Sequence, residues 1–220
     1  MKNNLRKDYL PNHKEMYIYQ RKDMFSLNTD TALLGEFFSF FDNESLLDIG
    51  TNNGALLLYA SLKAKGKLYG IDIFKEALKI ASLNLNEHNI DATLINIDAS
   101  NLILEEKVDV IISNPPFFKK EGSSSCLNPF LDVARREIYL SLDSLFNTVK
   151  NNLNKEGRFY LVHRFDRKNE ILKVGEKYGL YPSVIKDVYD KRVEKNVTSL
   201  FLFTFNKIEV EEVTYDLPIL

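Results

Sequence analysis

The sequence predicts an α/β fold in which helices cover both faces of a mostly parallel, doubly wound sheet. Short apolar runs that end in polar or turn residues recur along the 220-residue chain, and stretches with helical spacing lie between them. Such alternation favours right-handed βαβ units in one open sheet. No repeat and no Pro/Gly/Ser-rich linker divides the chain, so we expect a single domain over residues 1–220.

The elements follow from these runs and spacings. Buried parallel strands are expected at 46–49, 68–72, 92–97, 108–113 and 158–163, and helices at 55–63, 75–88, 133–153 and 168–178. Asn28-Thr29-Asp30 can cap a further helix through Thr31 to Phe41. The extended segments 183–188 and 198–206 have no helix between them and are expected to pair antiparallel at one edge. The start of the chain, about residues 1–27, is predicted to be irregular and basic, since residues 1–22 hold six Lys or Arg and two acids.

Composition excludes several classes of protein. An apolar fraction of 45% is too high for general disorder. The single cysteine, Cys126, cannot form an internal disulfide, and with three scattered histidines it predicts no metal site. No apolar run is long enough for a membrane span or a secretory signal, so we expect a cytoplasmic protein. The net charge of −2 provides no global attraction to nucleic acid, so an RNA partner would require local basic clusters.

The first expected strand runs into Asp48-Ile49-Gly50-Thr51-Asn52-Asn53-Gly54, and a helix follows at once. Gly50 would let the backbone turn sharply beside a ligand, and Gly54 would allow close packing of helix on strand. The loop lacks the G-x-G-x-x-G pattern of dinucleotide sites, and no Lys or Arg occurs from Asp42 to Leu62. A phosphate would be poorly bound here, whereas a ligand carrying a sulfonium and an ammonium group would be favoured. The pattern therefore predicts S-adenosylmethionine.

Two further strands end in acids. Asp72 lies 22 residues after Gly50, near the position at which an acid accepts hydrogen bonds from a ribose. Asp98-Ala99 ends the next strand and could meet the adenine edge of the same cofactor. An acid after a strand is more often a helix cap or turn residue, and that alternative holds for each one taken alone. Three acids at three successive strand ends favour the cofactor interpretation.

The fourth strand leads directly into Asn114-Pro115-Pro116-Phe117. An exocyclic amine on a planar ring is a poor nucleophile because its lone pair is delocalised. The Asn114 side-chain oxygen and the Pro115 carbonyl could accept its two N–H hydrogens, which favours a pyramidal nitrogen in the transition state. Pro116 stiffens the turn, and Phe117 offers a face on which the ring can stack. The alternative is a rigid loop that closes the strand, with Phe117 in the core.

At these residues the chain resembles the class I N-methyltransferases with an N-P-P-aromatic motif, and more closely the bacterial tRNA1(Val) adenine-37 N6-methyltransferase family. The segments that carry the resemblance are Asp48 to Gly50, Asn114 to Phe118, Asn28 to Leu34, Ala134 to Glu137 and Leu161 to Arg164. The chain departs from the usual pattern in having Asn52 for a glycine, Phe117 for a tyrosine and Arg136 for a histidine. Asparagine tolerates the positive φ that a glycine would adopt at position 52.

The resemblance implies a Rossmann-like, seven-stranded sheet with an antiparallel last strand and a tRNA anticodon loop as the partner. It adds Thr29, Asp30 and Ile73 to the expected cofactor contacts, beside Asp48, Gly50, Asn52, Gly54, Asp72, Asp98 and Ala99. The expected substrate contacts are Phe117, Phe118, Lys119, Lys120, Arg135 and Arg136. We expect a monomer or weak dimer.

Three rival functions remain open at this stage. A guanine-N2 methyltransferase acting on ribosomal RNA is compatible with phenylalanine at position 117. A release-factor glutamine methyltransferase uses a similar turn on a side-chain amide, but normally carries an additional N-terminal helical domain. A nucleotide-binding or RNA-binding module without catalysis is suggested by Asn52 and the weak net charge.

Overall fold

The computed structural model describes residues 5–115 and 140–218, and its main feature is an eight-stranded sheet with the order β10-β8-β9-β7-β6-β3-β4-β5. The first five of these strands along the chain, β3 to β7, are parallel to one another, whereas β9 is antiparallel to both β7 and β8. The strands are β3 (Ser45–Ile49), β4 (Lys67–Asp72), β5 (Thr93–Asn96), β6 (Val108–Ser113), β7 (Leu153–Arg164), β8 (Tyr181–Asp190), β9 (Lys195–Thr204) and β10 (Glu211–Asp216).

The predicted α/β class is confirmed, but the strand count of seven is wrong. The additional strand is β10, which lies at the edge and pairs in parallel with β8. Five of its six residues are exposed, so the strand is held mainly by backbone hydrogen bonds to β8. An exposed strand of this kind produces no apolar pattern. The antiparallel pairing of β8 with β9 is confirmed, although β9 lies inside the sheet, between β7 and β8.

Helices cover both faces of the sheet, because alternate strand residues point to opposite sides. Leu46 and Ile112 belong to a core shared with α1 (Thr29–Phe37), α2 (Ala55–Lys63) and α3 (Lys75–Glu87). Leu47 and Ile111 belong to a second core shared with α5 (Leu142–Asn152) and α6 (Lys168–Lys177). Short 3₁₀ turns, η2 (Ala99–Asn101) and η3 (Phe165–Arg167), follow β5 and β7.

The expected helices differ from the observed ones mainly at their ends. The Asn28 cap is confirmed, since its side-chain oxygen accepts from Thr31 N at 2.8 Å. The helix ends at Phe37 rather than Phe41, because the chain becomes extended at Phe38 and buries Phe38 and Phe40 in the core. The first part of the expected helix 133–153 lies outside the described residues, and the remainder begins at Leu142 with Ser141 as its cap.

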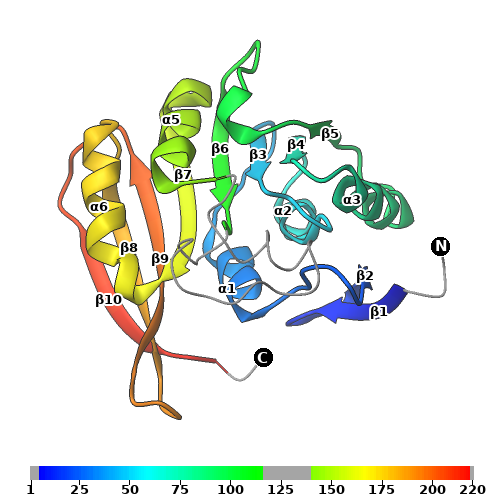
Figure 1. Ribbon diagram of the computed structural model, residues 1–220, viewed down its shortest axis with the longest axis horizontal. Coiled ribbons are helices and arrows are strands. Elements are labelled where there is room, and N and C mark those ends of the chain that lie inside the picture. The colour runs from blue at the N-terminus through cyan, green and yellow to red at the C-terminus, as the bar shows by residue number, and fades with distance from the viewer. Residues whose placement is uncertain (1–4, 116–139, 219–220) are drawn as a thin grey trace.

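The prediction of an irregular N-terminal segment is wrong for residues 5–21. Residues 5–21 form an antiparallel hairpin of β1 (Leu5–Leu10) and β2 (His13–Arg21), which lies beside α1 to α3 and away from β8 to β10 (Figure 1). In β2, Met16, Ile18 and Gln20 are buried. A polar residue at the third inward position, among many charges, weakens the apolar alternation on which the prediction relied.

Among the residues that the structure describes, no helix is both long enough and apolar enough to cross a membrane.

Candidate functional site

The polar residues selected from the sequence follow strands that end level with one another. Ile49 of β3 is in register with Ser113 of β6 and with Ile71 of β4, and the Ser113 hydroxyl donates to the Ile49 carbonyl at 2.9 Å. Asp72 is in register with Asn96 of β5. Neighbouring strands lie about 4.8 Å apart, so the residues after these strands share one edge of the sheet. In doubly wound sheets this carboxyl edge is where ligands bind.

Asp48 occupies the end of β3 and is fully buried. Burial raises the pKa of this carboxyl to about 7, and the negative charge of Asp72 adds to the shift. The Thr51 hydroxyl nearby opposes part of it, yet no group in residues 5–115 or 140–218 donates to either Asp48 oxygen in hydrogen-bonding geometry. An uncompensated carboxylate at a strand end suits a cationic ligand.

The loop after Asp48 adopts positive φ at residues that tolerate it. Gly50, Asn52 and Gly54 have positive φ of 79°, 50° and 81°. A Cβ on Gly50 would meet no atom within 4 Å, so this turn has open space above its backbone. At Gly54 the space is tight, because a Cβ there would meet Ala81 of α3 at 3.3 Å. Gly54 therefore allows the start of α2 to pack closely on α3, whereas the sequence predicted close packing of a helix on a strand.

Asp72, the last residue of β4, holds the same loop by a hydrogen bond. Its Oδ2 accepts from Asn52 N and its Oδ1 from Phe74 N, each at 2.9 Å. Burial raises the pKa of Asp72, and these backbone donors oppose the rise. A carboxylate oxygen can accept more than one hydrogen bond, so both oxygens retain acceptor capacity for a diol. The carbonyl of the neighbouring Ile73 accepts from Asn96 Nδ2 at 2.9 Å.

Asp98 has the capping role that was the alternative interpretation. Its Oδ1 accepts from Ser100 N at 2.9 Å and from Ser100 Oγ at 2.7 Å, which caps η2. Ala99 is buried, and its carbonyl accepts from Thr148 Oγ1 at 2.9 Å. The cap fixes Asp98 and Ala99 beyond the end of β5 without using the second carboxylate oxygen of Asp98.

Thr29 and Asp30 begin α1, and the structure connects Asp30 to β9 rather than to the loop after Asp48. Thr198 Oγ1 donates to Asp30 Oδ1 at 2.8 Å, and burial raises the pKa of Asp30. Thr29 is exposed. Among the described residues, no hydrogen bond joins either one to Asp48, Gly50 or Asp72.

Asn114 and Pro115 follow β6 directly, with Asn114 half-buried and Pro115 buried. Asn114 Nδ2 donates to Thr31 Oγ1 of α1 at 2.9 Å, so the start of the motif is held by a helix 83 residues earlier in the chain. The other residues predicted for catalysis or substrate binding lie outside the described residues: Pro116, Phe117, Phe118, Lys119, Lys120, Arg135 and Arg136.

Residues 15–179 match the family model described as the methyltransferase small domain. The chain belongs to this family. The match spans the carboxyl edge just described, from the hairpin to α6, and includes Asp48, Asp72 and Asn114.

Relatives of this methyltransferase confirm the resemblance drawn from its sequence. A protein of Phocaeicola vulgatus named tRNA1(Val) (adenine(37)-N6)-methyltransferase is 27% identical, over 93% of this chain and 88% of the relative. One of the same name from Trichodesmium erythraeum is 25% identical, over 92% and 90%. Ribosomal protein L11 methylase from Lactobacillus delbrueckii subsp. bulgaricus shares the fold, with a TM-score of 0.59 and 17% identity, over 84% of this chain and 82% of that one.

Sequence reasoning missed a second set of residues in this methyltransferase, which ties the N-terminal hairpin to the cofactor loop. Asn84 of α3 accepts from Tyr19 N at 2.7 Å and donates to the carbonyls of Tyr19 and Asn53, at 2.9 and 2.8 Å. Asn52 Nδ2 donates to the Phe25 carbonyl at 2.9 Å. A buried asparagine in the middle of an amphipathic helix was the available signal, because such a side chain requires partners.

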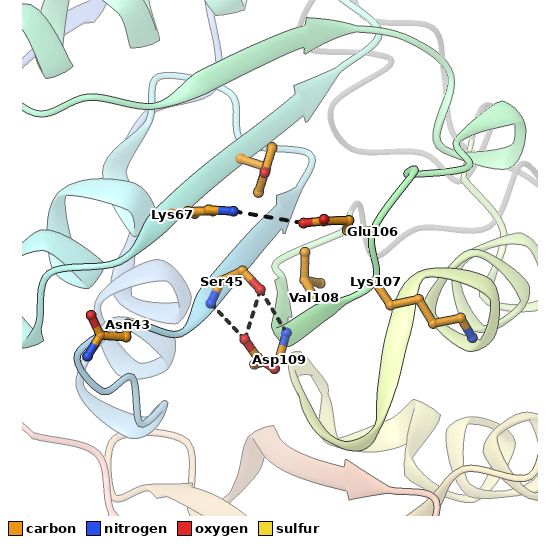
Figure 2. Close-up of a pocket in the computed structure, with 8 residues that line it drawn as sticks. Asn43, Ser45, Lys67, Glu106, Lys107, Val108 and Asp109 are labelled. Atoms are coloured by element: carbon orange, nitrogen blue, oxygen red, sulfur yellow. Dashed lines mark hydrogen bonds and ion pairs between the residues drawn. The ribbon is translucent and has the colours of Figure 1, made fainter.

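A cavity of about 240 Å³ lies at the other ends of the strands, where β3, β4 and β6 begin (Figure 2). Asp109 accepts there from both the backbone N and the hydroxyl of Ser45 at 2.9 Å, and Lys67 faces Glu106 at 3.8 Å. It lies at the start of β6, whereas Asn114 follows the end of that strand, so we assign the cavity no part in methyl transfer. Within the described ranges, no group of three or more His, Cys, Asp or Glu could hold a metal ion.

Proposed function

We propose that the protein is an S-adenosylmethionine-dependent methyltransferase that modifies N6 of adenine 37 in a tRNA anticodon loop. Relatives that carry this name match more than nine-tenths of the chain, which supports the substrate. The observation that carries the chemistry is the position of Asn114, one strand from the Asp48 loop and at the same edge of the sheet.

The residues around the Asp48 loop fit the cofactor. Asp48 provides a buried negative charge without a donor among the described residues, which suits the ammonium or sulfonium group. Asp72 has acceptor capacity for the ribose hydroxyls, and the open space above Gly50 lets a ligand approach the backbone. Asp98 and Ala99 remain our candidates for the adenine end. When bound, the cofactor supplies an electrophilic methyl group.

The chain's own residues act on the nucleophile. In the proposed complex, Asn114 Oδ1 and the Pro115 carbonyl accept the two N–H hydrogens of the exocyclic amine. These bonds strengthen as the nitrogen becomes pyramidal, so they stabilise the transition state more than the planar ground state. We place Phe117 against the face of the base, and the cationic pairs Lys119-Lys120 and Arg135-Arg136 against anticodon-loop phosphates.

Thr29 and Asp30 take a different place in the proposal. Because Asp30 is engaged by Thr198 of β9, we propose that both residues border the site rather than contact the ribose. The proposal also includes a single domain over residues 1–220, a cytoplasmic location, and a monomer or weak dimer that works without a metal.

Incubation with methyl-labelled S-adenosylmethionine and total tRNA, followed by digestion to nucleosides, tests the substrate. We expect label in N6-methyladenosine. Label in N2-methylguanosine, or only in protein, would instead support one of the rival functions, and no label at all would support a binding module.

Asn114→Ala tests the chemistry. We expect this variant to lose most of its turnover, at least about a hundredfold, because an acceptor used in the transition state is removed. Its affinity for S-adenosylhomocysteine should stay within about twofold of the wild type. An equal loss of turnover and affinity would contradict the assigned role.

A further inference from the structure

The Asn114 amide has two ends with opposite hydrogen-bonding character, and only one of them can accept from an amine. Rotation by 180° about the last side-chain bond would exchange its oxygen and its NH₂ group. The proposed catalytic role therefore requires one of two orientations. The contacts of Asn28 and Thr31 determine which one is adopted.

The first step in this determination is a backbone donor. Thr31 N can only donate, and it lies 2.8 Å from the side chain of Asn28, so the Asn28 atom that faces it must be the carbonyl oxygen. This is the cap of α1, and Asn28 therefore has no freedom to present its NH₂ group here.

The second step passes through a hydroxyl. Thr31 Oγ1 lies 2.9 Å from the same Asn28 oxygen, which cannot donate, so the single hydroxyl hydrogen of Thr31 must point to Asn28. Toward Asn114, Thr31 Oγ1 can then only accept. The Asn114 atom at 2.9 Å must consequently be the NH₂ nitrogen.

We propose that Asn28 and Thr31 form a positioning relay that holds the Asn114 amide with its oxygen available to the amine being methylated. The relay rests on the proposed function. Thr31 is only 6% exposed, which protects the hydroxyl from water that could offer a hydrogen in its place. Among the described residues no group donates to Asn114 Oδ1, so this end of the amide keeps its acceptor capacity. Neither Asn28 nor Thr31 touches the substrate in this arrangement.

The test compares Thr31→Val with Thr31→Ser in the full chain. Valine keeps the shape of threonine without the hydroxyl, so the amide can rotate, and we expect kcat with tRNA to fall about tenfold, the effect of one neutral hydrogen bond. KM for tRNA and the affinity for S-adenosylhomocysteine should stay within about twofold. Serine keeps the hydroxyl and should keep kcat within about twofold of the wild type.

Several outcomes would overturn the relay. Wild-type kcat in Thr31→Val would do so, as would an equal loss in Thr31→Ser. If thermal unfolding shows that Thr31→Val is unfolded, Asn28→Ala and Asn28→Asp replace it. Aspartate keeps the acceptor and should retain kcat, whereas alanine frees the Thr31 hydroxyl and should lower it, and equal kcat in both would refute the relay.

Asn114→Ala separates the two proposals. If this variant keeps its turnover, the proposed function of Asn114 is wrong and the relay has no target. If it loses turnover while Thr31→Val retains it, only the relay is wrong.

Discussion

Replacing Asp48 with asparagine is expected to make the protein more stable at pH 8 while weakening its hold on the cofactor. Asp48 is fully buried and its pKa is raised to about 7 from an ordinary value of 3.8, chiefly because burial disfavours the charged form. Above pH 7 the folded protein must keep a poorly compensated negative charge in its interior. Asparagine occupies nearly the same volume without that charge.

The magnitude follows from proton linkage. Between pH 3.8 and about 7 the folded protein retains a proton on Asp48 that the unfolded chain has released, so stability falls as the pH rises. Each pH unit corresponds to about 1.4 kcal/mol, so the whole window is worth about 4 kcal/mol. Burial lowers the pKa of His163 to about 3 and produces the opposite slope between pH 3 and 6.5. Because His163 is common to both proteins, the difference between them isolates Asp48.

The assay is urea unfolding of the wild type and of Asp48→Asn between pH 4.5 and 8.5. We expect the free energies of unfolding to differ by only about 1 kcal/mol at pH 4.5, and the difference to grow toward about 4 kcal/mol in favour of the variant above pH 7. Asp91→Asn, an exposed change after α3, is the control and should follow the wild type at every pH. A variant that is less stable than the wild type at pH 8 would refute the reasoning.

Cofactor affinity provides the second half of this prediction. A cationic ligand binds the charged form of Asp48, so wild-type affinity should rise as the pH passes through about 7. Calorimetry with S-adenosylmethionine, which carries both the sulfonium and the ammonium, should show this rise in the wild type and not in Asp48→Asn. An identical rise in both proteins would mean that Asp48 does not face the ligand's charge.

Two further predictions concern the same edge of the sheet. Asp72→Ala should weaken S-adenosylhomocysteine binding at least about tenfold, because the acceptor for the ribose and the support of Asn52 N are lost together; unchanged affinity by calorimetry would reject the ribose contact. Asn84→Ala should lower the free energy of unfolding by about 3 kcal/mol, since three hydrogen bonds to the hairpin and loop are lost, whereas the exposed Asn86→Ala on the same helix should change it little in urea unfolding.

Local sequence determined the elements whose signals lie within a few residues. The apolar run of β3 and the helix over 55–63 were predicted at nearly their observed bounds, since burial imposes a strand or helix period on neighbouring residues. The turn chemistry of Gly50 and Asn52 was equally local, because a positive φ restricts which residues fit. The Asn28 cap belongs to the same class of signal.

Tertiary structure decided the features in which distant segments meet. The N-terminal hairpin depends on a polar contact 65 residues away, between Tyr19 and Asn84, and β10 depends on backbone pairing with β8 rather than on an apolar face. The apolar periodicity of a segment does not indicate such partners, because these hydrogen bonds depend on where distant segments lie in the folded chain and not on the local residue pattern.

The same distinction applies to the site. From the sequence alone, Asn114 could be named and given a role, since its place after a buried strand is a local property. The orientation of its amide depends on Thr31, 83 residues earlier, and on the Asp48 loop lying one strand away. A hydrogen bond requires its two partners within about 3 Å and correctly directed. Only the folded sheet and the capped helix together bring them to that distance.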